Sequence, residues 1–110
     1  MQHTQTRIYR RSLELATLAR LAIESLPRGF ASLADQLRRA AGSVTENFAE
    51  GCGKRTARDR RRYFDTARGS AYEVAAAFDV GVALGALEPE LAERASDIAD
   101  HLGAMLYKYR

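Results

Sequence analysis

The residues of this sequence best suited to binding chemistry form a basic run near the middle of the chain. They are Lys54, Arg55, Arg58, Arg60, Arg61, Arg62 and Arg68, with Asp59 and Asp65 among them. Guanidinium groups contact phosphate oxygens in pairs, and a cluster of them supports salt-sensitive, sequence-independent binding of nucleic acid. Two alternatives stay open: a solvated helix face, or a contact with acidic residues of a neighbouring subunit.

A row of carboxylates follows one helical face near the C-terminus, at steps of three, four and three residues. The row consists of Glu90, Glu93, Asp97 and Asp100. Carboxylates suit hard cations, but this row has no second, converging set of ligands, so we predict no metal site. An ion-pair contact with a neighbouring subunit and a solvated face both remain open.

A third group of polar residues borders an apolar stripe between residues 36 and 50. Its members are Gln36, Ser43, Asn47 and Glu50, with Arg38 and Arg39 as donors and Glu73 as an acceptor. Polar side chains at the border of a core need partners. We therefore predict a structural polar layer of hydrogen bonds and ion pairs between two helices.

Three catalytic interpretations are weak. Glu50 and Glu73 would supply the carboxylate pair of a bundle enzyme, but neither histidine follows a glutamate at the Glu-x-x-His spacing of di-metal bundles. The segment 51–56 lacks the first glycine and the preceding strand of a phosphate-binding loop. Cys52 has no evident His or Asn partner for thiol catalysis. We predict no catalytic residue and no cofactor.

The elements that would position these side chains are four helices. Clusters of turn and cap residues interrupt the chain at Pro27–Gly29, Gly51–Gly53 and Gly85–Pro89. Ser32 and Thr56 are the expected N-caps of the second and third helices. Apolar residues recur at steps of three and four in each segment, and the fourth keeps an unbroken seven-residue repeat. The pattern predicts one all-α domain over residues 1–110, an antiparallel up-down four-helix bundle.

Composition agrees with this fold and indicates the compartment in which the protein resides. The 110 residues are 46% hydrophobic and 28% charged, with a net charge of +3. That charge is unevenly spread, since residues 28–68 carry a net +5 and residues 69–110 a net −4. The lone cysteine fits a reducing compartment, and no apolar run approaches the ~20 residues of a membrane span. We expect a cytoplasmic protein with no membrane partner.

More apolar residues are present than one bundle core needs. The surplus consists of Leu13, Leu21, Ile23, Tyr72, Val80 and Leu84. A wide core is one explanation, and burial against a second copy of the chain is the other, because large exposed apolar patches are rare on monomers.

Two stretches carry a family resemblance: QLRRAAGSVTENFAEG from Gln36 to Gly51, and YFDTARGSAYEV from Tyr63 to Val74. With the Leu84-Gly85 turn, they resemble the four-helix bundle proteins encoded in intervening sequences of bacterial large-subunit rRNA genes. The resemblance implies a bundle that assembles into a ring, usually a pentamer, without established enzymatic activity. It also implies kinship with the accessory bundle protein of diversity-generating retroelements, which binds a reverse transcriptase and nucleic acid through a basic surface.

These observations together predict a non-enzymatic, homo-oligomeric bundle that binds RNA, another nucleic acid or a nucleoprotein through the basic run. The alternative is an interaction or scaffold protein whose charged faces serve only self-assembly.

Overall fold

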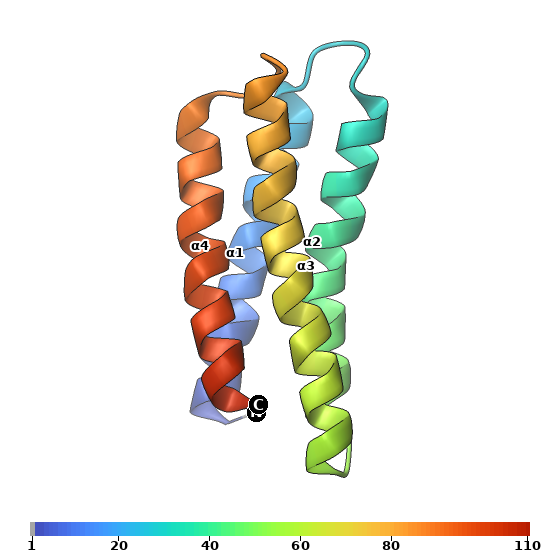
Figure 1. Cartoon of the computed structure of the whole chain (residues 1–110), viewed down its shortest axis with the longest axis vertical. Coiled ribbons are helices and arrows are strands. Elements are labelled where there is room, and N and C mark those ends of the chain that lie inside the picture. The colour runs from blue at the N-terminus through green and yellow to red at the C-terminus, as the bar shows by residue number, and fades with distance from the viewer. Residues whose placement is uncertain (1) are drawn as a thin grey trace.

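The computed structural model describes residues 2–110 and consists of four helices in an up-down arrangement (Figure 1). They are α1 (His3–Ser25), α2 (Ala31–Cys52), α3 (Ala57–Ala83) and α4 (Pro89–Tyr109). The bundle measures 45 × 21 × 19 Å. The predicted all-α, antiparallel four-helix bundle is confirmed, and each break lies where the turn and cap residues placed it.

The helix ends follow from local chemistry. Gly29 and Gly85 have φ angles of 99° and 75°, a left-handed conformation that side chains with a Cβ disfavour. Thr56 is the N-cap of α3 as predicted, because its Oγ1 accepts a 3.1 Å hydrogen bond from the Asp59 N–H. Pro89 occupies the first turn of α4, where its missing N–H costs nothing.

The predicted N-cap at Ser32 is wrong. Phe30 holds that position, and its carbonyl accepts a 3.0 Å hydrogen bond from the Ala34 N–H. Phe30 also packs against the core, so burial of its ring fixes where the chain enters α2. Ser32 is left as an exposed residue in the first turn.

The core lies where the periodic stripes meet. The α2 stripe from Leu33 to Gly51 and the α3 stripe from Phe64 to Gly81 are buried throughout. Phe64 stacks on Phe48 with ring centroids 5.4 Å apart, and the Tyr109 ring centroid lies 5.6 Å from that of Phe64. Three helices therefore meet around one aromatic ring near the lower end of the bundle.

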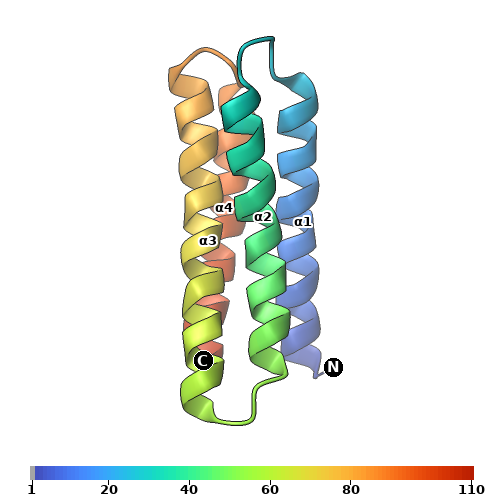
Figure 2. The ribbon, with the colours of Figure 1, turned by 90° about the vertical axis from the view of Figure 1, so that its right-hand side faces the viewer.

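The α2–α3 hairpin extends past the ends of α1 and α4 at that lower end (Figures 1 and 2). Gly51 makes the close packing there possible, since a Cβ at this position would lie 2.6 Å from a ring carbon of Phe64. The projecting hairpin carries residues 54–62 of the basic run, and Gln2 and Arg110 lie beside it.

Candidate nucleic-acid interface

The exposed part of the basic run lies on the α2–α3 turn and the first two turns of α3. Arg55, Arg58, Arg61 and Arg62 are all exposed. Among residues 2–110, no carboxylate forms an ion pair with any of these four side chains. Like charges one turn apart repel each other, and positive charge near a helix N-terminus opposes the helix dipole. The arrangement is therefore one that a bound anion would stabilise.

Two other members of the run are used within the hairpin. Arg60 is half-buried, and its Nη1 donates to the carbonyls of Lys54 and Arg55 over 3.2 and 3.1 Å. The Lys54 ammonium lies 3.2 Å from a carboxylate oxygen of Glu50, and this hydrogen bond and charge raise the pKa of Lys54. These contacts hold the turn in one shape.

Arg68, the last member of the run, lies apart from the others at the contact between α3 and α4. Its Nε donates a 3.1 Å hydrogen bond to the carbonyl of Gly103, and its guanidinium lies 5.3 and 5.6 Å from the ring centroids of Tyr72 and Tyr107. The side chain is half-buried. The structure thus gives Arg68 a packing role between two helices, which the count of charges in the sequence did not reveal.

The short members of the predicted polar layer are brought together. The hydroxyls of Ser43 and Ser70 lie 2.7 Å apart, and Asn47 donates to the Ser43 carbonyl and hydroxyl, each over 2.9 Å. Sequence reasoning missed Ser70, although its place beside the buried Ala71 in the α3 stripe was a signal. It also missed the buried Ser12, which accepts a 2.8 Å hydrogen bond from Thr45 between α1 and α2.

The prediction that this layer also contains ion pairs between the two helices is wrong. Arg39 pairs with Asp35 on its own helix, at 2.8 Å, and Glu50 pairs with Lys54. The remaining charged or long polar members are exposed: Gln36, Arg38 and Glu73. The physical reason is solvation, because long charged side chains extend to water or to an oppositely charged partner on their own helix, while the short Ser43 and Ser70 side chains meet between the helices.

The alignment of α2 against α3 separates the two carboxylates considered for catalysis, Glu50 and Glu73. Ser43 faces Ser70, so Glu50 lies seven residues below this point on α2 and Glu73 three residues above it on α3. At 1.5 Å per residue the two are about 15 Å apart along the bundle axis. They do not form a pair.

The acidic row, Glu90, Glu93, Asp97 and Asp100, is exposed along α4. Within the described residues, no three His, Cys, Asp or Glu side chains gather as metal ligands would. No helix in that part of the chain is long and apolar enough to span a membrane.

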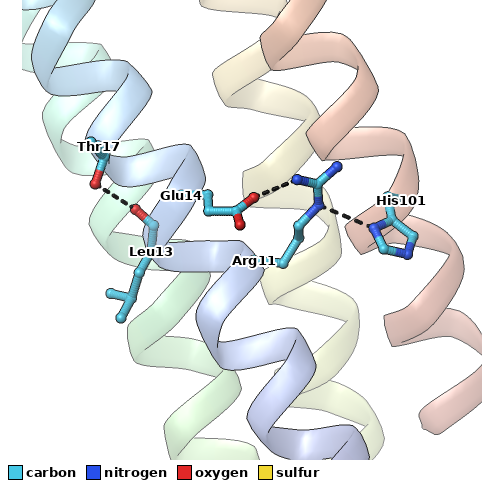
Figure 3. A network of polar contacts seen from close by, with 5 residues as sticks. All are labelled: Arg11, Leu13, Glu14, Thr17 and His101. Atoms are coloured by element: carbon cyan, nitrogen blue, oxygen red, sulfur yellow. Dashed lines mark hydrogen bonds and ion pairs between the residues drawn. The ribbon is translucent and has the colours of Figure 1, made fainter.

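A groove of about 640 Å³ runs between α1 and α4. Leu13 and Leu21 line it and are 43% and 40% exposed. Arg11 bridges the two helices there, since its Nε donates to Nδ1 of His101 over 3.1 Å and its Nη1 pairs with Glu14 (Figure 3).

The surplus apolar residues, for which a wide core was one explanation, are largely exposed. Tyr72, Val80 and Leu84 join Leu13 and Leu21 on the surface, and Leu84 is 61% exposed. Ile23 is the exception, because it is half-buried and packs against the core. The surface therefore keeps apolar area that one copy of the chain does not cover.

The fold and the site define a class: a small antiparallel four-helix bundle with a basic hairpin at one end. Within that class the chain belongs to the 23S rRNA-intervening sequence protein family, whose profile matches residues 4–108. The predicted family resemblance is confirmed.

Among solved structures, the chain is similar to a protein with unknown function from the S23 ribosomal protein family of Bacteroides thetaiotaomicron. The two share 16% identity and a TM-score of 0.83, with 93% of this chain and 96% of that chain covered. That likeness shows the fold. No curated protein has significant similarity to this chain.

Proposed function

We propose that this protein is a non-enzymatic homo-oligomer that binds nucleic acid, alone or within a nucleoprotein, through the exposed arginines of the α2–α3 hairpin. The observation that carries the proposal is the set of four exposed arginines without an ion-pair partner among residues 2–110, held on a hairpin whose turn is fixed by Arg60. Phosphate groups of a nucleic-acid backbone match such a surface without any reading of sequence.

Assembly is the second part of the proposal, and the resemblance noted above makes a pentamer the expected state. The exposed Leu13, Leu21, Val80 and Leu84 support it, because a second copy would cover this apolar area. The alternative function rests on the same surfaces: in a pure scaffold, the arginines would meet the acidic row of α4 in a neighbouring subunit.

One variant separates the two functions. Reversing Arg58, Arg61 and Arg62 to glutamate places acidic groups in the first turns of α3, where the helix dipole favours them, so the fold should persist by circular dichroism. For nucleic-acid binding, fluorescence anisotropy should show lost affinity for RNA and DNA oligonucleotides. Light scattering should show an unchanged mass several times the 12.2 kDa of one chain.

The control carries the same change of charge elsewhere, with the exposed Arg20 of α1, Arg28 of the α1–α2 turn and Arg38 of α2 reversed. It should keep most of the affinity, and the affinity of the unmodified protein should fall linearly with the logarithm of salt concentration. If the hairpin variant instead dissociates into smaller species, the scaffold function is correct. If it keeps both its mass and its binding, both proposals are refuted.

A further inference from the structure

The ribbon shows the projecting hairpin beside the ends of α1 and α4 at the lower end of the bundle (Figures 1 and 2). Residues from this end line a pocket of about 420 Å³. We call it the basal pocket. Its polar lining consists of Gln2, Gln5, Cys52, Arg60, Tyr109 and Arg110. Phe64, a core residue, closes it toward the interior. All four helices therefore contribute to one recessed, largely polar site.

Two amide oxygens of this pocket already accept hydrogen bonds. The Tyr109 hydroxyl donates to Oε1 of Gln2 over 2.9 Å, and the backbone N–H of Gln2 donates to Oε1 of Gln5 over 3.1 Å. Each amide has one oxygen and one NH₂ group, so these bonds fix its orientation and leave the NH₂ group as a donor. The pocket thus offers donors to a ligand.

The pocket also carries positive charge, which suits an anionic ligand. Arg60 uses Nη1 for the hairpin turn, which leaves Nε and Nη2 free of hydrogen bonds to residues 2–110. Arg110 adds a second guanidinium, with its Nε 3.4 Å from the Asp65 carboxylate outside the pocket lining. Burial raises the pKa of the Cys52 thiol, so Cys52 contributes no negative charge near neutral pH.

Other hollows of the surface contain acidic side chains. The groove between α1 and α4 contains Glu14 and Asp97, and the hollow at the α2–α3 turn contains Asp59. No carboxylate side chain lines the basal pocket. An anion would therefore meet two guanidinium groups and two amide donors there, and the Asp65 carboxylate that pairs with Arg110 lies outside the pocket lining.

We propose that the basal pocket binds a phosphomonoester, namely the terminal phosphate of a nucleic-acid strand. The inference rests on the proposed function and names which part of the nucleic acid this end of the bundle would hold. A recessed pocket closed by Phe64 accepts the end of a strand but not a backbone that must continue past it. A phosphomonoester also carries about −1.5 to −2 charges at neutral pH, against −1 for a backbone phosphodiester, which suits two guanidinium groups.

The test compares strands that differ only in this phosphate. Anisotropy is measured for one single-stranded RNA with a 5′-phosphate, a 3′-phosphate or hydroxyls at both ends. We expect the full chain to bind at least one phosphorylated form about tenfold more tightly than the hydroxyl form, the gain typical of a charge-assisted hydrogen bond.

A matched pair of variants assigns the preference to the pocket. Gln5→Glu keeps the oxygen that accepts the Gln2 N–H, and glutamate at this helix position is favourable, so the fold is retained. It replaces the amide donor by a negative oxygen, and the preference for the phosphorylated strand should disappear. Gln36→Glu makes the same change at an exposed site on α2 and should keep the preference.

The outcomes separate this inference from the function on which it rests. Equal binding of all three strands overturns the pocket assignment and leaves nucleic-acid binding intact. Absence of binding by every strand refutes the proposed function and the inference with it. If adenosine 5′-monophosphate raises the melting temperature of the unmodified chain but not of Gln5→Glu, while strand ends bring no gain, the pocket takes free phosphomonoesters and the strand-end assignment is overturned.

Discussion

The contact between α2 and α3 and the contact between α1 and α4 are built in opposite ways. Between α2 and α3, Phe48 and Phe64 stack inside the core, Gly51 admits the Phe64 ring, and Ser43 meets Ser70. Between α1 and α4, a groove stays open, with exposed leucines on its wall and the Arg11–His101 contact across it. The first contact is complete within one chain and joins the two helices that carry the basic hairpin. The second leaves surface that a partner would bury.

The comparison predicts its largest effect at Gly51. Gly51→Ala forces a Cβ against the Phe64 ring, which is 1% exposed and stacks on Phe48. We expect a loss of about 1–3 kcal/mol in the free energy of unfolding, the usual cost of overpacking, measured by chemical denaturation. The control is Gly69→Ala, whose Cβ would meet nothing within 4 Å. It should gain about 0.5–1 kcal/mol, because alanine is the better helix former. Similar effects of both changes would show that the α2–α3 contact is looser than it looks.

A medium effect should distinguish the polar contacts of the two regions. Ser70→Ala removes one of the two hydrogen-bond partners of the half-buried Ser43 hydroxyl, leaving Asn47, and should cost about 1 kcal/mol. Arg11→Ala removes the α1–α4 bridge, whose partners are mostly solvated, and should cost about 0–1 kcal/mol. Thermal unfolding followed by circular dichroism measures both. A larger loss from Arg11→Ala would reverse the comparison.

The smallest effect is expected at Glu73. An ion-paired layer between α2 and α3 would have made Glu73→Ala costly, but the residue is exposed, as is Glu93 on α4. Both alanine variants should therefore change the free energy of unfolding by less than about 0.5 kcal/mol. A clear loss at Glu73 alone would show that the charged layer does form.

The fold was readable from the sequence because its signals are local. Glycines and prolines marked three breaks, Thr56 marked a cap, and the apolar steps gave the buried face of each helix. The division of the basic run into exposed arginines and arginines used within the fold could be predicted only in part. Arg60 lies one helical turn before the buried Phe64, so its inward direction follows from the periodicity of α3.

The remaining errors depend on how helices align. That Ser43 faces Ser70, and that Arg68 reaches Gly103, is set by the register between helices, which is a property of the packed core. No pattern within one segment encodes it. The charged layer was wrong for this reason, since it paired residues by type without knowing which of them lie at the same height.

The connectivity of the bundle has a consequence for how it folds and opens. Neighbouring helices in space follow one another in the chain, except α1 and α4, whose Tyr109 and Gln2 are 107 residues apart yet hydrogen-bonded. Closing so long a loop costs more chain entropy than closing the hairpin turns, so the α1–α4 contact should be the last to form. It is also the contact with the open groove, and it should be the first to open in the native state. Amide exchange is then expected to be fastest where α1 and α4 meet and slowest along α2 and α3.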